Sequence, residues 1–196
     1  MERELKSPIH LNTRQMAVVG MLSGITIFLG ISGLGFIPLP TGVKATIMHL
    51  PVIIGAIIEG PIVGSIIGLA FGLFSMYQAF TAPTPLSFWF WNPVIALLPR
   101  ILIAFTSYYC YSLFKNKDKG FAIGLAAVVG TLTNTLGVLA LSYIFYLERI
   151  ATTLKISNSA VLKFMVGIGV TNGIPEAAIS ALIALPVGLA ILKMKK

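Results

Sequence analysis

Charged residues are scarce in this chain of 196 residues, at 10% of the sequence, whereas hydrophobic residues make up 57%. A soluble domain carries about 25% charged residues, so this chain lacks the polar side chains needed to cover a water-exposed surface. Because a membrane-spanning helix needs roughly 20 apolar residues, the composition predicts an all-α membrane protein with six transmembrane helices. It leaves no room for a separate soluble module, and we expect one domain over residues 1–196.

Cysteine and histidine are also scarce. Cys110 is the single cysteine, which excludes a disulfide within the chain. His49 has no second histidine or carboxylate near it at metal-ligand spacing, so we expect no metal site there. The sequence has no Gly-rich loop ending in Gly-Lys-Ser/Thr, no Gly-x-Ser-x-Gly and no His-Glu-x-x-His. These absences predict that the chain is not an enzyme and needs no cofactor.

The apolar runs define the expected helices. Two breaks are clear, at Gly60-Pro61 and in the proline-rich stretch before Asn92. The second helix is short for a membrane span unless it is tilted or half-buried. We expect helices at about 15–34, 48–59, 61–79, 92–114, 120–146 and 161–192.

Basic residues gather at the ends of these helices and give a net charge of +8, which we attribute to membrane orientation and not to nucleic acid. With six spans, three basic clusters fall on one side of the membrane, which the positive-inside rule makes the cytoplasm, together with both termini. Arg149, Lys155 and Lys163 are exceptions on the outer side. The clusters are Arg3, Lys6 and Arg14; Lys115, Lys117 and Lys119; and Lys193, Lys195 and Lys196.

The predicted outer loops, residues 35–47, 80–92 and 147–160, differ from the inner turns. The first two contain paired prolines and are apolar, so we expect them to be structured and to fold back over the helices. This asymmetry indicates a site that opens to the outside.

Small residues recur every four positions in three places, which places them on one helix face. Such ladders let helices approach closely in lipid, either within this chain or against another membrane subunit. The first helix is the better candidate for docking a partner. The ladders are Gly60, Gly64, Gly68 and Gly72; Gly169, Gly173, Ala177 and Ala181; and, on the first helix, Gly20 and Gly24, with Ala17 nearby.

Two charged residues lie at membrane depth, Arg100 in the fourth predicted helix and Glu176 in the sixth. Such charges are costly and usually face a cavity or a partner. Either Arg100 pairs with Glu176 and joins two helices, or its guanidinium binds the carboxylate of a ligand. Lys44 in the first outer loop is either a second positive charge for that ligand or a solvated loop residue.

Other polar and aromatic residues are expected at the outer end or along the inner helix faces. A small-ligand pocket is mostly apolar with a few hydrogen-bonding groups, although tryptophan and tyrosine also occupy membrane interfaces without a ligand. The further candidates for substrate binding are Thr41, Thr46, His49, Tyr77, Gln78, Trp89, Trp91, Asn92, Asn134 and Asn172.

Three stretches carry a resemblance to a known family. Ile37-Pro-Leu-Pro-Thr-Gly, the run from Thr46-Ile-Met-His-Leu-Pro to Glu59-Gly-Pro, and Asn92-Pro-Val-Ile-Ala-Leu-Leu-Pro-Arg resemble the S components of energy-coupling factor (ECF) transporters, as does the glycine-laddered third helix. The resemblance implies a subunit that captures one vitamin outside the cell and pairs with the membrane scaffold EcfT and two cytosolic ATPases. It also implies docking through small residues of the first helix, here matched by size at Gly20 and Gly24.

Among S components, the chain looks most like the pantothenate type. Pantothenate has one carboxylate, hydroxyls and an amide, which suits Arg100 together with asparagine and threonine side chains. S components for folate, hydroxymethylpyrimidine or pyridoxine are the alternatives. Three other classes are a stand-alone membrane facilitator, an intramembrane enzyme using Glu176 and Asn172, and a structural assembly subunit.

Overall fold

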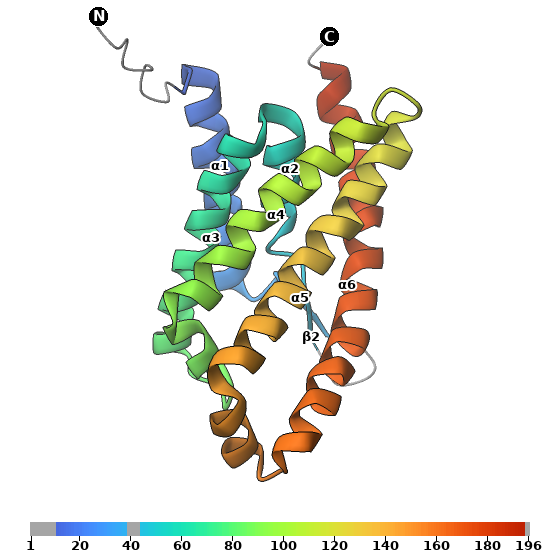
Figure 1. Ribbon diagram of the computed structural model, residues 1–196. Coiled ribbons are helices and arrows are strands. Elements are labelled where there is room, and N and C mark those ends of the chain that lie inside the picture. The colour runs from blue at the N-terminus through green and yellow to red at the C-terminus, as the bar shows by residue number, and fades with distance from the viewer. Residues whose placement is uncertain (1–10, 39–43, 195–196) are drawn as a thin grey trace, which may run out of the picture.

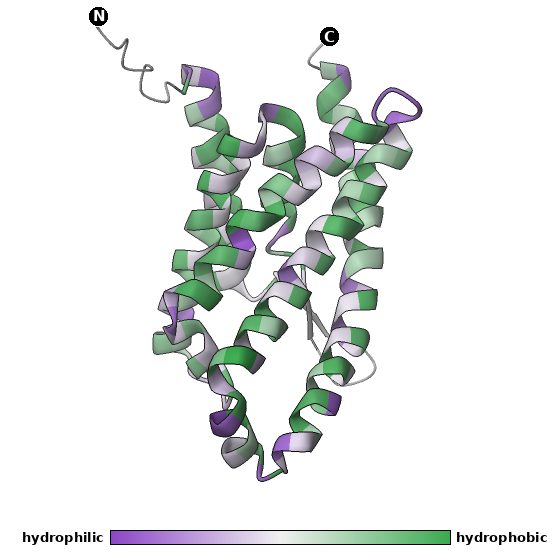
Figure 2. Cartoon of the chain, viewed as in Figure 1, coloured by the Kyte–Doolittle hydropathy of each residue, from purple (hydrophilic) through white to green (hydrophobic). Residues whose placement is uncertain are grey.

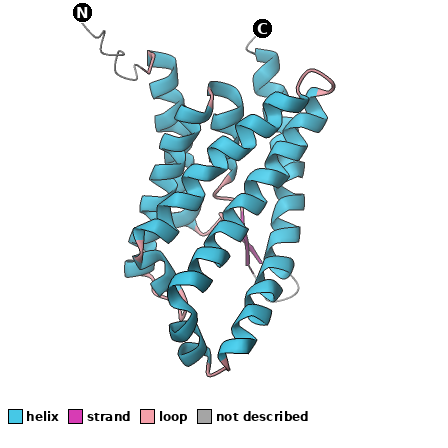
Figure 3. Ribbon diagram, viewed as in Figure 1, coloured by secondary structure: helices cyan, strands magenta, loops and turns pink. Residues whose placement is uncertain are grey.

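The computed structural model describes residues 11–38 and 44–194 and is a bundle of helices with one small pair of strands (Figures 1 and 3). The prediction of an all-α fold is confirmed apart from this strand pair. The helices are α1 (Thr13–Ser32), α2 (Leu50–Glu59), α3 (Pro61–Thr81), α4 (Pro93–Phe114), α5 (Lys119–Leu154) and α6 (Asn158–Met194), with a 3-10 helix η1 (Ser87–Trp91). Strands β1 (Phe36–Pro38) and β2 (Lys44–Thr46) are antiparallel.

Five of the six helices are long and apolar enough to cross a membrane, whereas the sequence predicted six transmembrane helices. The exception is α2, whose 10 residues extend only about 15 Å at 1.5 Å per residue. A bilayer core is about 30 Å thick. Strand β2 leads into α2, and the two segments together run through the interior of the bundle (Figure 1).

Helix α2 is the centre of the bundle, since it contacts the other five helices. Every residue from Leu50 to Ile58 is buried, and a helix that is hydrophobic on all sides is expected in such a position. Hydrophobic residues also cover the full length of the outer helices, while hydrophilic residues concentrate at the two ends of the bundle (Figure 2). The short second helix is therefore a packing element surrounded by the longer ones.

The order of the helices brings three chain segments to one end of the bundle. Helix α1 begins, α4 turns into α5, and α6 ends at this same end (Figure 1). Here Arg14 Nη2 lies 3.0 Å from Glu59 Oε1 and ties the start of α1 to the end of α2. We call this the basic end, because the turn between α4 and α5 carries Lys115 and Lys117.

The glycine ladder of α3 packs inside the chain. A Cβ at Gly64 would lie 2.6 Å from the Cβ of Ala56 in α2. At Gly72 it would lie 2.6 Å from the carbonyl oxygen of Ala96, and at Gly68 it would meet the carbonyl oxygen of Arg100. These glycines bring the backbones of α3 and α4 into close approach, as small residues do in membrane helices.

The last two helices are longer than the predicted ranges of 120–146 and 161–192. Helix α5 continues to Leu154 through non-helical dihedrals at Tyr146, where φ is −133° and ψ is 21°. The predicted outer loop at 147–160 is thus largely helical, because α6 already begins at Asn158. Only a short turn, with Lys155 in the left-handed region, joins the two helices.

Candidate functional site

A cavity of about 410 Å³ lies at the end of the bundle opposite the basic end. Its walls come from the strand pair, the second half of α3, the segment that leads into η1, and the facing sides of α4 and α5. This volume falls in the range of about 300–1,000 Å³ that small-molecule sites occupy. The lining residues are Phe36, Thr46, Met48, Phe71, Ser75, Gln78, Ala79, Ala82, Thr84, Ser87, Phe90, Arg100 and Asn134.

Among the described side chains that line this cavity, Arg100 is the one charged residue. It is only 4% exposed. Its Nη1 donates a hydrogen bond of 2.8 Å to the carbonyl oxygen of Ile95. The guanidinium carbon lies 4.7 Å from the ring centre of Phe90 and 5.3 Å from that of Phe71. No carboxylate among the described side chains lies within ion-pair distance of Arg100.

Two polar atoms at this cavity lack protein partners. Within the described residues, neither Arg100 Nε nor Asn134 Oδ1 has a hydrogen-bond partner, although both are buried. One is a donor and the other an acceptor. A buried polar group without a partner costs free energy of roughly 1–3 kcal/mol, so a ligand that brings an acceptor to Arg100 and a donor to Asn134 is favoured.

Glu176 does not pair with Arg100, so the helix-joining hypothesis is wrong for this structure. Its Oε1 accepts a hydrogen bond of 2.8 Å from the backbone N–H of Thr46. Its Oε2 accepts one of 3.3 Å from the hydroxyl of Thr135. The carboxylate is 5% exposed and fastens β2 to α6. Glu176 therefore shapes the cavity through Thr46, a lining residue, and does not line the cavity itself.

His49 is a structural residue of the bundle core. It is fully buried just before α2. Its Nε2 lies 2.8 Å from the hydroxyl of Thr131 and 2.8 Å from that of Ser180, which links α2 to α5 and α6. In the described part of the chain, no group of three histidine, cysteine, aspartate or glutamate side chains is placed to hold a metal ion.

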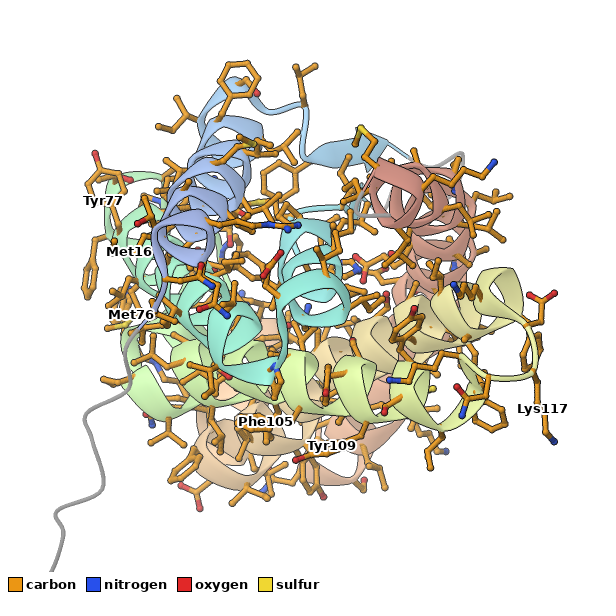
Figure 4. All side chains as sticks on the ribbon, turned by 90° about the horizontal axis from the view of Figure 1, so that it is seen from above. Met16, Met76, Tyr77, Phe105, Tyr109 and Lys117 are labelled. Atoms are coloured by element: carbon orange, nitrogen blue, oxygen red, sulfur yellow. The ribbon has the colours of Figure 1, made fainter. Side chains whose placement is uncertain are left out.

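The structure brings together four of the predicted site residues, namely Thr46, Gln78, Arg100 and Asn134, all of which line the cavity. Tyr77 is 61% exposed and points away from the bundle (Figure 4). Trp89 is buried in the hydrophobic cluster beside α5. Asn92 caps α4 by accepting from the N–H of Val94.

The remaining predicted residues lie away from the cavity or cannot be placed in it. Trp91 stacks on Phe80, with ring centres 5.8 Å apart. Asn172 is half-buried on α6 and is not a lining residue. Lys44 belongs to β2 by its backbone, and Thr41 lies outside the described residues.

Sequence reasoning missed most of the apolar lining and three hydroxyl residues, Ser75, Thr84 and Ser87. A signal for part of it exists on α3. Phe71, Ser75 and Gln78 are spaced by four and three residues, which places them on one helix face. A search for polar residues on that face would have separated Gln78 from Tyr77.

The outer wall of the cavity is held by aromatic contacts. The guanidinium carbon of Arg149 lies 4.4 Å from the ring centre of Phe88 and 5.2 Å from that of Trp91. Phe88 also packs edge-on against Tyr146, at 5.4 Å between ring centres. These contacts fix η1 against the kinked end of α5, so that Ser87 and Phe90 remain part of the cavity wall.

Helix α1 presents an open face. Ala17, Gly20 and Gly24 are exposed, and a Cβ at either glycine would meet no atom of the described residues within 4 Å. Only 11% of the 18-residue apolar stretch of α1 is buried within the chain. This face is free for lipid or another membrane helix.

The comparisons with known proteins agree with this architecture. The sequence matches the family described as "ECF transporter, substrate-specific component" over residues 14–188. It is 36% identical over 170 residues to a pantothenic acid transporter PanT of Lactococcus lactis subsp. cremoris, covering 80% of this chain and 82% of the relative.

A pantothenate transporter PanT of Leuconostoc mesenteroides subsp. mesenteroides is 31% identical over 163 residues, covering 79% and 80% of the two chains. The predicted family is thus confirmed, and with it a role in membrane transport and not in enzymatic catalysis. The chain belongs to the substrate-specific components of ECF transporters, as a multi-pass membrane protein.

Proposed function

We propose that this chain captures pantothenate on the outer side of the membrane and presents it to the energising module of an ECF transporter. The observation that carries the proposal is Arg100, a buried cation that faces a cavity of about 410 Å³ and has no counter-ion among the described side chains. A ligand carboxylate in this place completes a charge-assisted hydrogen-bond pair. The names of the two relatives support the same substrate.

The rest of the cavity suits the other groups of pantothenate. Asn134 Oδ1 has no partner among the described residues and accepts a hydroxyl or an amide N–H. Thr46, Ser75 and Gln78 add hydroxyl and amide groups around an otherwise apolar lining. Such a lining, with few polar groups at fixed places, is typical of specific small-molecule sites.

The orientation follows from the basic end. Arg14, the turn with Lys115 and Lys117, and Lys193 lie at that end of the bundle, so the positive-inside rule places it in the cytoplasm. The cavity then opens outside. The open face of α1 with Ala17, Gly20 and Gly24 is the surface on which the scaffold EcfT docks, and two cytosolic ATPases supply the energy through that scaffold.

The decisive experiment measures ligand binding to the purified protein. Mass spectrometry of co-purifying small molecules should detect pantothenate for the wild type, and titration should give saturable binding. Arg100→Gln should weaken binding by at least about 30-fold, since breaking a buried charge pair costs roughly 2–5 kcal/mol. Lys117→Gln, an exposed cation in the turn between α4 and α5, is the control and should bind like the wild type.

Two outcomes would contradict the proposal. Tight binding by Arg100→Gln would show that the carboxylate lies elsewhere, and tighter binding of folate or pyridoxine than of pantothenate would reassign the substrate. The melting temperature of each variant must be measured, because a loss of binding counts only where Arg100→Gln remains folded. Uptake into liposomes by this chain alone, without ATPases, would indicate a facilitator.

A further inference from the structure

In the part of the chain that the structure describes, aromatic rings and not an acid lie against the buried guanidinium of Arg100. Phe90 from η1 and Phe71 from α3 have their ring centres 4.7 Å and 5.3 Å from its central carbon. Both phenylalanines line the cavity. Ile95 supplies the one hydrogen bond that the described residues give to this guanidinium.

A binding site for an anion must bury a cation whose donors are still available to the ligand. An unpaired cation is expensive to bury, and a protein carboxylate beside it would lower that cost but would also occupy the N–H groups that a ligand needs. Glu176, the buried acid of α6, is instead held by Thr46 and Thr135. An aromatic face attracts a cation without accepting its N–H groups in a conventional hydrogen bond, so the donors remain open to the ligand.

The chain builds this arrangement by close helix packing. Phe71 lies between Gly68 and Gly72, the two glycines at which α3 meets the backbone of α4 near Arg100 and Ala96. Larger residues at these positions would separate the two helices and move the ring of Phe71 away from the guanidinium. The glycine ladder thus places an aromatic ring beside the charge.

We propose that Phe71 and Phe90 are specificity-determining residues, which hold Arg100 in the empty cavity as an unpaired cation with free donors and thereby select a ligand with a carboxylate. This inference rests on the proposed function. Without the rings, the guanidinium turns to water or to a backbone acceptor, and a ligand carboxylate must first displace these partners. Losing a ring therefore weakens binding of the anion more than binding of a neutral analogue.

The test compares two ligands that differ at one group. Pantothenate carries the carboxylate, and pantothenol carries an alcohol in its place. We expect the wild type to prefer pantothenate. Phe90→Leu and Phe71→Leu keep apolar bulk but remove the ring, and each should reduce that preference by roughly tenfold, as expected for a desolvated cation–π contact. Binding of pantothenol should change by less than about twofold in the same variants.

Matched controls separate this role from packing. Phe74→Leu changes a buried ring on the same helix that does not line the cavity, and it should keep the wild-type preference. Phe90→Tyr retains a ring and should also keep the wild-type preference for pantothenate. Because Phe90 is only half-buried, we expect Phe90→Leu to fold. If Phe71→Leu does not fold, the titrations of Phe90→Leu test the inference by themselves.

Equal losses for both ligands, an unchanged preference, or tighter binding of pantothenate by the leucine variants would each overturn the inference while leaving pantothenate as the substrate. A wild type that binds neither ligand would instead overturn the proposed function, and the inference with it. The two failures are therefore distinguishable in one set of titrations.

Discussion

The two halves of this bundle differ in how closely their helices and side chains are packed. Around α2, the interior is closed: every residue from Leu50 to Ile58 is buried, and Gly64 allows the backbone of α3 to approach Ala56 and Ala104. Around the cavity, the chain leaves a space of about 410 Å³ that is lined partly by polar groups. There Arg100 Nε and Asn134 Oδ1 are buried without partners in the described chain.

The difference shows how a small membrane protein combines stability with binding. In lipid, helices associate through close packing and hydrogen bonds and not through a hydrophobic driving force. The closed half supplies that packing. There His49 Nε2 lies within hydrogen-bond distance of the hydroxyls of Thr131 and Ser180, although His49 Nδ1 has no partner among the described residues. In the cavity half, the unsatisfied polar atoms instead lie beside a space that a ligand can enter.

The largest expected effect comes from Gly68→Leu, which breaks the packing on which both halves depend. A side chain there would meet the backbone of Arg100 and Ile101, and a backbone cannot move aside as a side chain end can. We expect a loss of about 3 kcal/mol or more in stability, at the upper end for overpacked cores, with binding lost as well. Thermal melting of the purified protein measures this.

Gly124→Leu is the matched control for that variant, because a Cβ at Gly124 of α5 would meet nothing within 4 Å. It should melt within a few degrees of the wild type. If both variants melted alike, close approach at Gly68 would not be what stabilises the closed half.

A smaller effect, confined to the cavity half, is expected from Glu176→Ala. The backbone N–H of Thr46 and the hydroxyl of Thr135 lose their acceptor, which costs roughly 1–3 kcal/mol, and β2 is no longer fastened to α6. We expect about tenfold weaker pantothenate binding, corresponding to roughly 1.4 kcal/mol, as measured by titration.

Glu176→Gln keeps an amide oxygen for Thr46 and should recover most of the affinity. Glu148→Ala removes an exposed acid near the end of α5 and should change nothing. Wild-type affinity in Glu176→Ala would show that the strand pair keeps its position without this acid.

The smallest effect on the isolated protein is expected at a surface that belongs to neither half. Gly20→Leu and Gly24→Leu add side chains to the open face of α1, where no neighbouring atom lies within 4 Å of the added Cβ. Melting temperature and pantothenate affinity should stay at wild-type values. Uptake by cells that contain the whole transporter should fall sharply, because the proposed docking of EcfT on this face requires close approach.

Co-purification with the scaffold and ATPases measures the same step directly. Normal uptake by both variants would show that the scaffold docks elsewhere on the bundle.

Much of the fold was predictable, because hydropathy and helix-breaking residues report directly on membrane helices. The break at Gly60-Pro61 and the helical character of all six segments follow from the sequence. The status of α2 was harder to predict. A short apolar helix has the same sequence pattern whether it spans a thin part of the membrane or lies inside a bundle. Only the contacts of α2 with the other five helices show that it lies inside the bundle.

The charged residues of the candidate site were predictable from the sequence, but most of the residues that line the cavity were not. A charge in an apolar run stands out, which is why Arg100 and Glu176 were found, but their partners depend on the positions of other helices. Tyr77 and Gln78 are neighbours in sequence, yet one points to the outside and the other lines the cavity. About 100° of helix rotation separates successive residues at 3.6 residues per turn, so a prediction without the helix phase places both together.

The size of the cavity adds a second basis for selection to the charge of Arg100. On the proposed function, a space of about 410 Å³ admits a compact vitamin whose carboxylate reaches the guanidinium, and it excludes much larger derivatives that carry the same group. Volume and charge together then decide which molecules this subunit accepts.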